Sequence, residues 1–443
     1  MISYSIIQKS QLEGALRLDA EYYRPEYLEI RKNIESISFS DFKEIIISFG
    51  SGKNLPQSNN NKSTKFIRTQ NVRPIIIDKN GISFTEEKNC PKLDYGDLLF
   101  VRVGEGVGDN SVVTRGFCNS TFSDNVIRIK IKKVNPFYIS VLLNSRIGSL
   151  LMEQIKKGSA RPLISRENLD SLKIPAIPEK EQFYFENIVN QAEELIEESE
   201  TIYSQAENLL LEELGLADFK EADELFSIVK LSDIKSAERM DAEYFQPKYE
   251  KLTSRVKKRN GKLLGDLVSI KKGIEPGAEE YQEKGKLFIR VSSLSKQGII
   301  DKDQKYLSDE LYRKLKNDFE PKVGEILLTK DATPGIARVL KEPVEGIIAG
   351  GVLRLKTKID IEPEYLALVV NSIIGQAQAE RDAGGSVIAH WKPEQIRNML
   401  IPILPKPTQQ KIASLVKKSH QARKKAKELL DEAKAKVEAL IEK

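Results

Sequence analysis

The feature that most constrains this chain is an internal repeat. The stretch LDAEYYRPEY begins at Leu18, and the closely similar MDAEYFQPKY begins at Met240, 222 positions later. The tripeptide FIR recurs at the same distance, at Phe66 and Phe288, and the later pairs NSRIG/NSIIG and IPAIP/IPILP recur at 227. A chance similarity does not keep its order and spacing in this way, and the period is far too long for a solenoid. The repeat therefore predicts two copies of one structural unit.

Each copy shows the same order of local patterns. A DAEY segment is followed by short runs rich in β-branched and aromatic residues, separated by turn residues, which is typical of a mostly β module. Two short helical stretches follow, around NPFYISVLLNS and EPEYLALVVNS, and an IPxxP segment then leads into a long helix. The predicted divisions are 1–178 for the first module with its DAEY segment, 179–221 for the first long helix and linker, 222–405 for the second module with its DAEY segment, and 406–443 for the second long helix.

The two long helices carry a coiled-coil pattern. Apolar or small residues recur at alternating spacings of three and four from Phe185 to Leu209 and from Ile412 to Ala433. The first helix is rich in glutamate and the second in lysine, so each complements the other and repels a copy of itself. These patterns predict an antiparallel helix pair within the chain; the alternative is that each helix lies on its own module. The residues expected on the helix–helix seam include Ile188, Leu195, Ile202, Leu415 and Leu429.

Composition limits the kinds of site that the chain can carry. Cys90 and Cys118 are the only cysteines and His390 and His420 the only histidines, so neither a disulfide framework nor a metal site is expected. A net charge of +5 is compatible with nucleic-acid binding. No apolar run approaches the ~18 residues that span a bilayer, and the first residues lack the features of a signal peptide. A cytoplasmic protein without membrane contact is therefore expected.

Taken together, these elements resemble the specificity subunits of type I restriction–modification systems. The resemblance covers essentially the whole chain and rests on GDLLF-like elements at 96–100 and 324–328, and on the exits LKIPAIPEKEQ from Leu172 and LIPILPKPTQQ from Leu400. It implies an α+β fold in which two pseudo-symmetric, β-rich target recognition domains are separated by a pair of long antiparallel coiled-coil helices. It also implies that each domain reads one half of a bipartite target in double-stranded DNA, while the helices set the gap between the halves.

The same resemblance implies the partners and the absence of chemistry on this chain. Two modification (methyltransferase) subunits would dock on the helices, and restriction subunits would complete the complex. S-adenosylmethionine and methyl transfer would belong to those partners. No cofactor, metal or catalytic residue is therefore expected here.

Two other functions compete with this interpretation. The glycine-rich VGEGVGD from Val103 and the NPFY at Asn135 invite the hypothesis of a stand-alone DNA adenine methyltransferase. The second copy replaces them with KDATPGIAR from Lys330 and EPEY from Glu362, so neither feature is shared, and Asn135 is better explained as a helix cap before Pro136. GSGK at residue 50 lacks the full phosphate-loop spacing and is interpreted as a turn. The other alternative is a coiled-coil scaffold with β-rich protein-binding modules.

Candidate DNA-binding residues are the basic, amide and hydroxyl side chains in loops between the β-rich runs, since such groups bind phosphates and base edges. In the first module they are Lys53, Asn54, Arg68, Gln70, Asn71, Arg73, Arg102, Asn110, Arg115 and Arg161. In the second they are Lys271, Lys272, Arg290, Ser292, Ser293, Lys330, Arg338, His390, Trp391 and Lys392. Trp391 has packing in the domain as its alternative role.

The repeated DAEY segments are acidic and aromatic, which does not suit contact with DNA. Asp19, Tyr22, Asp241 and Tyr244 are predicted either to fix each module against the helical spacer or to form a repeated docking surface for two partner subunits. Scaffold and docking elements have to match in the two copies, whereas loops that read DNA are free to differ. Because those loops differ most, the two half-sites are expected to be unlike.

Overall fold

The computed structural model describes residues 4–9, 12, 18, 20–104, 106–156, 163–219, 226–300, 304–383 and 389–442. The chain divides into two compact units, which are Met1–Glu197 with Lys424–Lys443 (unit 1) and Glu198–Arg423 (unit 2). Each unit therefore contains one β-rich module and a part of both long helices. Among the helices in the described ranges, none is long and apolar enough to cross a membrane.

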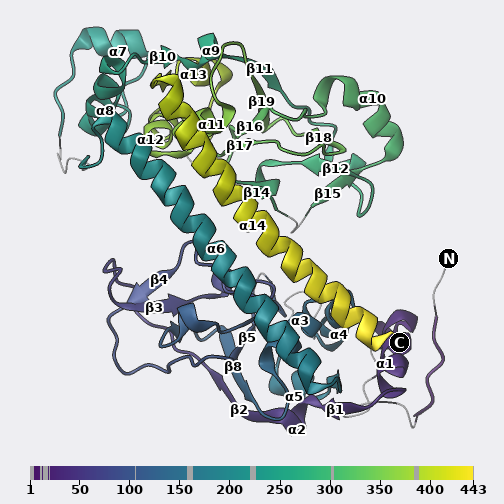
Figure 1. Ribbon diagram of the computed structural model, residues 1–443. Helices are drawn as coiled ribbons and strands as arrows, with labels where there is room; N and C mark the ends of the chain where they lie inside the picture. The colour runs from purple at the N-terminus through teal and green to yellow at the C-terminus, as the bar shows by residue number, and fades with distance from the viewer. Residues whose placement is uncertain are drawn as a thin grey trace. The chain divides into compact units, whose positions relative to one another are not determined.

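The module of unit 1 is built on three small sheets (Figure 1). The largest has the strand order β2-β8-β5-β6 with antiparallel neighbours, a second has the order β4-β3-β7 with β3 and β7 parallel, and β1 pairs with β9. The strands are β1 (Phe39–Asp41), β2 (Ile46–Ser51), β3 (Thr64–Ile67), β4 (Ser83–Thr85), β5 (Leu98–Val101), β6 (Asn110–Val112), β7 (Thr121–Phe122), β8 (Val126–Ile131) and β9 (Lys173–Pro175). The helices are η2 (Ala20–Tyr23), α1 (Pro25–Glu35), α2 (Phe42–Ile45), η3 (Thr69–Asn71), η4 (Arg115–Phe117), α3 (Pro136–Leu143), α4 (Arg146–Ile155), α5 (Arg166–Asp170) and the long α6 (Glu179–Leu214).

Unit 2 repeats this topology. Its sheets have the orders β11-β19-β16-β17, β15-β12-β18 and β10-β20, and β12 and β18 are again parallel; β13 and β14 form an additional hairpin. The strands are β10 (Lys262–Leu263), β11 (Val268–Lys272), β12 (Lys286–Ile289), β13 (Leu294–Ser295), β14 (Gly298–Ile299), β15 (Lys305–Leu307), β16 (Ile326–Thr329), β17 (Ala337–Val339), β18 (Gly346–Ile348), β19 (Val352–Thr357) and β20 (Leu400–Ile401). The helices are α7 (Leu231–Ala237), α8 (Pro247–Lys258), α9 (Leu264–Leu267), η5 (Ala278–Glu280), η6 (Val291–Ser293), α10 (Asp309–Phe319), α11 (Pro363–Asn371), α12 (Ile373–Asp382), α13 (Pro393–Arg397) and the long α14 (Lys406–Ile441).

The exits from the two modules are equivalent in detail. The buried Tyr138 donates a hydrogen bond to the carbonyl of Pro175 at 2.8 Å, and Tyr365, 227 positions later, donates to Pro402 at 2.7 Å. The IPxxP segments begin as short strands that pair with β1 and β10. The repeat in sequence is therefore a repeat in structure, and the predicted α+β class with two similar β-rich modules is confirmed.

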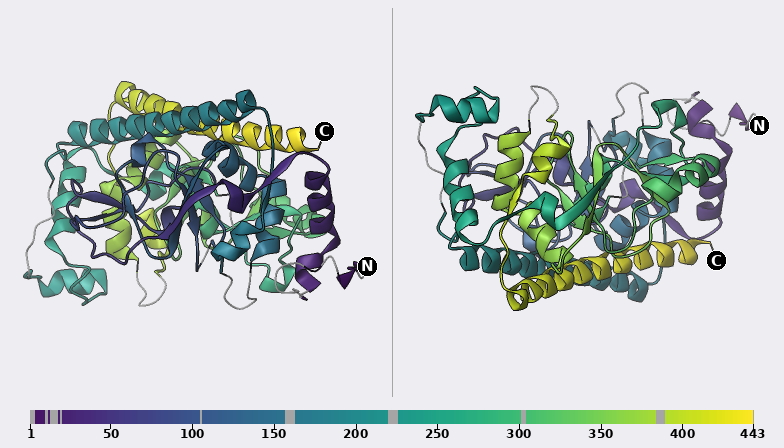
Figure 2. Two further views of the ribbon diagram at one scale, coloured as in Figure 1. Left: turned by 90° about the horizontal axis from the view of Figure 1, so that it is seen from below. Right: turned by 90° about the horizontal axis from the view of Figure 1, so that it is seen from above.

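The two long helices run side by side in opposite directions within each unit (Figures 1 and 2). In unit 1 the hydroxyl of Tyr184 on α6 donates to Glu432 on α14 at 3.0 Å. In unit 2 the hydroxyl of Ser419 donates to the carbonyl of Ser199 at 2.8 Å, and both serines are buried. Small residues on the seam permit this close approach. The predicted antiparallel pairing is thus present in both units.

The predicted seam residues are not fully buried, and four of the five pack against a core. The residues that are half-buried rather than buried are Ile188, Leu195, Ile202, Leu415 and Leu429. Their neighbours Val189 and Val416 are buried instead, each in the core of its unit. The apolar stripe is wider than a coiled-coil seam because each helix packs on a module as well as on the other helix. The two arrangements weighed as alternatives from the sequence are therefore both present.

The oppositely charged side chains of α6 and α14 form ion pairs with each other and also with the modules. Lys436 on α14 pairs with Glu181 on α6 at 2.8 Å. Glu197 on α6 instead pairs with Lys79 of its module at 2.5 Å. Charge complementarity therefore contributes to the packing of a helix on its module as well as to the helix pair.

Candidate nucleic-acid interface

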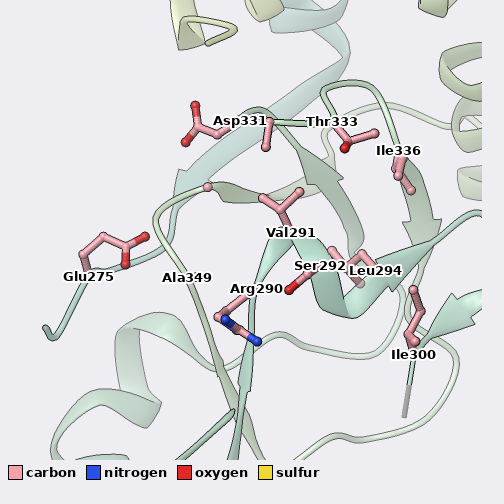
Figure 3. Close-up of a pocket in the computed structure, with 12 residues that line it drawn as sticks. Glu275, Arg290, Val291, Ser292, Leu294, Ile300, Asp331, Thr333, Ile336 and Ala349 are labelled. Atoms are coloured by element: carbon pink, nitrogen blue, oxygen red, sulfur yellow. The ribbon is translucent and has the colours of Figure 1, made fainter. Parts of the chain in front are cut away.

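In unit 2 the fold brings several predicted residues together around a pocket of about 560 Å³ (Figure 3). Arg290 and Ser292 come from the start of η6, Asp331 from the turn after β16, and Ala349 from the turn after β18. Glu275 lines the same pocket from the loop that follows β11. The pocket thus collects charged and hydroxyl side chains from three segments that are far apart in the sequence, and a fourth segment lines it with small residues.

A second pair of candidates adjoins this pocket through Asp331. The Asp331 carboxylate accepts hydrogen bonds from Lys330 Nζ at 2.5 Å and bonds to His390 Nδ1 at 2.9 Å. Burial alone would raise the pKa of Asp331, but these two partners outweigh it and hold the pKa below its ordinary value. The carboxylate therefore stays ionised and fixes Lys330 and His390 at the edge of the pocket.

Unit 1 has the same backbone framework with different side chains. The amide of Ile164 donates to the carbonyl of Arg102 at 3.2 Å, as the amide of Trp391 donates to Lys330 at 2.9 Å in unit 2. Val103 forms a β-bridge with Leu163, as Asp331 does with His390. Arg102 is exposed and occupies the position of Lys330.

Gly52 and Gly273 occupy equivalent positions at the start of the loops that follow β2 and β11. At each glycine the backbone closely approaches that of a neighbouring segment. A Cβ on Gly52 would lie 2.0 Å from the carbonyl oxygen of Phe122, and one on Gly273 would lie 2.1 Å from that of Ala349. Only glycine permits this approach of two backbones. The exposed Lys53 and Asn54 follow Gly52 directly. The segment GSGK is accordingly a strand end followed by a close backbone contact, since residues 50 and 51 end β2 and pair with β8 rather than forming the predicted turn.

Four candidates are buried, which corrects their assignment as direct DNA contacts. The side-chain amide of Asn71 donates to the carbonyls of Asp78 and Asn80, which holds a turn together. Trp391 is fully buried in the main core of unit 2, so packing is its role in this structure. The buried candidates are Asn71, Asn110, Ser293 and Trp391. Polar side chains look alike in sequence whether they face solvent or hold the backbone of a loop, and that ambiguity explains the error.

Two of the remaining candidates, Arg115 and Arg338, lie beside the long helices. Arg115 lies over the ring of Tyr95 at 5.9 Å, and the Tyr95 hydroxyl donates a hydrogen bond to Glu186 of α6. Burial lowers the pKa of Arg338, which lies near Tyr203 of α6 and Arg423 of α14, to about 10. The exposed candidates are Gln70, Lys271, Lys272 and Lys392, and the half-exposed ones are Arg68 and Arg73. Arg161 lies outside the described residues.

His420 is the second histidine and lies on the inner side of α14. Burial lowers its pKa to about 3, and the charges of Arg338, Lys341 and Arg423 act in the same direction. The ring of Tyr203 on α6 lies 6.2 Å away, between ring centroids. His420 is therefore neutral at physiological pH and acts as a packing residue.

Replacing His420 with glutamine is expected to make unit 2 less sensitive to acid. The unfolded chain binds a proton at His420 below its ordinary pKa of 6.5, whereas the folded chain binds it only near pH 3, so stability falls as the pH drops from 6.5 toward 3. At pH 5 this loss is about 2 kcal/mol in the unaltered chain and absent in the variant. Urea unfolding at pH 7 and pH 5, followed by the fluorescence of Trp391, measures it. Equal pH dependence of the two proteins would contradict the expectation.

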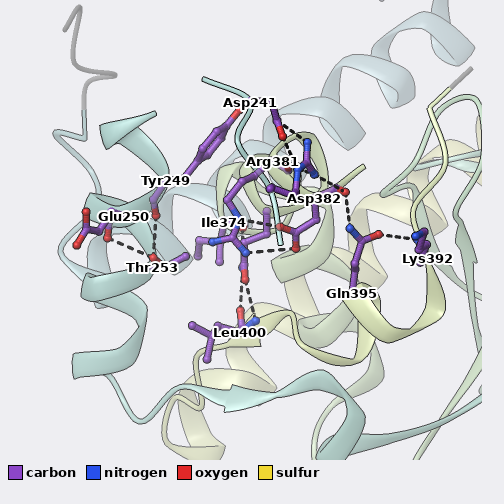
Figure 4. A network of polar contacts seen from close by, with 12 residues as sticks. Asp241, Tyr249, Glu250, Thr253, Ile374, Arg381, Asp382, Lys392, Gln395 and Leu400 are labelled. Carbon is purple, nitrogen blue, oxygen red and sulfur yellow. Dashed lines mark hydrogen bonds and ion pairs between the residues drawn. The ribbon is translucent and has the colours of Figure 1, made fainter. Parts of the chain in front are cut away.

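The second DAEY segment is fastened to α12 by a cluster of charges and rings (Figure 4). Arg239 donates two hydrogen bonds to Asp241, at 2.8 and 2.5 Å, and these hold the pKa of Asp241 below its ordinary value. Arg239 also donates to the carbonyls of Arg381 and Asp382 at the end of α12. The ring of Tyr244 has the guanidinium groups of Arg239 and Arg381 at 4.7 and 5.2 Å from its centroid.

The first DAEY segment is fastened to the equivalent short helices of unit 1. Tyr22 is buried, its hydroxyl accepts from Arg31 of α1 at 3.0 Å, and its carbonyl accepts from Gln154 of α4 at 2.9 Å. Asp19 lies outside the described residues. In the structure both segments therefore contact short helices of their own modules. Their predicted roles, in fixing the modules to the spacer or in docking partner subunits, stay predictions.

The features that suggested an enzyme have structural explanations. The side chain of Asn135 accepts a hydrogen bond from the amide of Phe137 at 2.9 Å, and Pro136 opens α3, as expected for a helix cap. Gly104, Gly106 and Gly108 all have positive φ, so these glycines serve the backbone of the connection between β5 and β6. No group of three or more potential metal ligands occurs in the described part of the chain.

Sequence reasoning missed the acidic members of the pocket. Glu275 and Asp331 were not among the predicted residues, because cations, amides and hydroxyls are the groups that most often contact DNA. The available signal was positional, since both acids follow basic residues in predicted loops, in KKGIE and KDATPG. Carboxylates also bind base edges, where they accept from amino groups.

Comparison with known proteins gives one match to a family. Residues 260–434 match the family model described as the type I restriction modification DNA specificity domain, which confirms the resemblance indicated by the sequence motifs. No curated protein matches the chain. The solved structures that match the chain include a type I restriction-modification system S subunit from M. genitalium (14% identity, 91% of this chain and 95% of that chain, TM-score 0.41). The HsdS subunit from Thermoanaerobacter tengcongensis is another (14% identity, 91% and 94%, TM-score 0.29). Similarity of this degree bears on no detail of this chain.

Proposed function

From the premise that this chain carries a type I restriction–modification DNA specificity domain over residues 260–434, we propose that it is the sequence-specific DNA-binding subunit of such a system. Each unit reads one half of a bipartite target. Unit 2 does so through the loops that line its pocket, and unit 1 through the equivalent loops. The chain itself has no catalytic role.

The observation that supports this proposal most is a shared framework with unlike loop side chains. Strand order, the glycine contacts and the exit hydrogen bonds recur in both units, whereas Asp331 and His390 replace Val103 and Leu163 at equivalent bridges. A duplicated framework suits two sites on one duplex, and unlike side chains suit two different half-sites.

The long helices supply the second part of the proposal. We infer that they set the distance between the half-sites and dock two modification subunits, each of which would carry its own S-adenosylmethionine, with restriction subunits as further partners. Repeated surfaces in two equivalent units suit two copies of one partner. Such a complex works on chromosomal DNA, which fits the expected cytoplasmic location.

The test is a map of methylated adenines in host cells with and without this chain, with the partner subunits expressed in both. The expected result is loss of one split motif in the cells that lack the chain. An unchanged map, with partner subunits present and active, would contradict the proposal and favour a scaffold role.

Binding by the purified chain separates the remaining alternatives. We expect it to select a split motif from random duplex DNA, with affinity that falls steeply as salt rises, because phosphate contacts release counterions. Calorimetry with S-adenosylmethionine should give no heat of binding. Tight binding of that cofactor to the chain alone would favour the methyltransferase alternative.

A further inference from the structure

The pocket of unit 2 is lined by two carboxylates that differ in their hydrogen bonding. The carboxylate of Asp331 is hydrogen-bonded to Lys330 and His390. Glu275 is exposed, and it has no hydrogen bond or ion pair with any residue that the structure describes. A carboxylate that lines a pocket and has no partner is available to accept hydrogen bonds from a ligand.

The backbone opposite Glu275 leaves room for its side chain. A Cβ on Gly350 would lie 2.9 Å from Glu275 Oε1, so a larger residue there would push the carboxylate away. A Cβ on Gly351 would lie 2.8 Å from Val291 Cγ2 and 3.3 Å from Asp331 Oδ2. Gly350 therefore leaves room for Glu275 beside the 349–351 turn, and Glu275 lines the pocket that Arg290 and Ser292 also line (Figure 3).

The chemistry of an ionised carboxylate restricts what it can read on DNA. It accepts hydrogen bonds and donates none, so it is attracted to an amino group and repelled by the O4 of thymine or the O6 of guanine. It also repels phosphates, so its presence in a DNA-binding surface weakens binding that is not sequence-specific. We propose that Glu275 is the acceptor for the exocyclic amine of a cytosine or adenine in the half-site read by unit 2. This inference rests on the proposed function.

The equivalent position in unit 1 supports a role in specificity. The amides of Lys53 and Ile274 donate to the carbonyls of Phe122 and Ile348, each at 3.1 Å, which aligns the two loops residue by residue. Asn54 then occupies the position of Glu275. Its amide both donates and accepts, so the two units offer different chemistry at one equivalent place.

The first step of the test is selection of random duplex DNA by the full-length chain and by Glu275→Gln. Glu283→Gln is the matched control, since Glu283 is an exposed glutamate on the following loop that does not line the pocket. Glu275→Gln is expected to relax the base preference at one position of one half-site by roughly 10- to 100-fold, to leave the other half unchanged, and to bind non-specific DNA no more weakly. The control should select as the unaltered chain does. Trp391 fluorescence verifies folding of unit 2.

The second step removes the amine alone from the selected site. Purine in place of adenine, or 2-pyrimidinone in place of cytosine, at the affected position is expected to weaken the unaltered chain roughly 10- to 100-fold and Glu275→Gln less than about 3-fold. The base at which this occurs distinguishes cytosine from adenine. Equal losses in both proteins, or an unchanged motif in Glu275→Gln, would overturn the inference. Failure of the unaltered chain to select any motif would instead reject the proposed function.

Discussion

Replacing Gly52 with alanine is expected to destabilise unit 1 by about 3 kcal/mol or more. The new Cβ would lie 2.0 Å from the carbonyl oxygen of Phe122 and 2.5 Å from that of Ser123, so the segment after β2 would have to move away from the end of β7. The exposed loop with Lys53 would move with it. Selection of one half-site should then be lost while the other half-site is kept. Hydrogen exchange of residues 64–67 and 121–131 measures the local opening.

Gly50 provides the control two residues earlier, within β2. A Cβ at Gly50 meets nothing within 4 Å, so Gly50→Ala should be neutral or slightly stabilising. Gly273→Ala repeats the experiment in unit 2, where Trp391 fluorescence reports unfolding. Similar hydrogen exchange in Gly50→Ala and Gly52→Ala would refute the argument.

Lengthening both long helices by seven residues is expected to widen the gap of the DNA target by about three base pairs. Seven residues add about 10.5 Å to a helix, and a base pair occupies about 3.4 Å of duplex. The seven residues are inserted between Leu195 and Ile196 in α6 and between Ala422 and Arg423 in α14, at matching positions along the two helices. The contacts between the two helices on either side of the insertions are then preserved. The sequences of the two halves should not change, because the pocket residues are untouched. Some affinity should be lost, since the halves also rotate around the duplex.

Insertion into one helix only is the control for this experiment. It puts the two helices out of register, so the buried contact of Ser199 with Ser419 cannot form together with the pairing in unit 1. Binding to the original target and to the widened one should both weaken. Selection of an unchanged gap by the chain with both insertions would exclude the helices as the spacer.

The repeat, the long helices and the helix caps could be predicted from sequence because each has a periodic or positional signal. Asn135 and Pro136, for example, mark the start of α3 by residue type alone. The register of the long helices could not be predicted in full. Val189 is buried in place of Ile188 because α6 also contacts a module, and that contact depends on the tertiary fold.

The candidate site was predicted in part for a similar reason. The sequence identified the correct loops, and Arg290, Ser292, Lys330 and His390 meet at or beside one pocket. It could not separate loop residues that face solvent from those that hold the loop, which is why the buried Asn71 was included. The contribution of Glu275 depends on Gly350, 75 positions away, and only the folded backbone brings them together.

The composition of the core of unit 1 has a consequence for biosynthesis. Ala426, Ala433, Val437 and Ile441 are buried in that core together with residues of the first module. The first module is therefore synthesised long before its own packing partners leave the ribosome. At about 5–20 residues per second, the ~240 residues between the two stretches take roughly 10–50 s to make. During that time the part of the unit 1 core that α14 covers is exposed, so we expect the nascent chain to bind chaperones until translation has nearly finished.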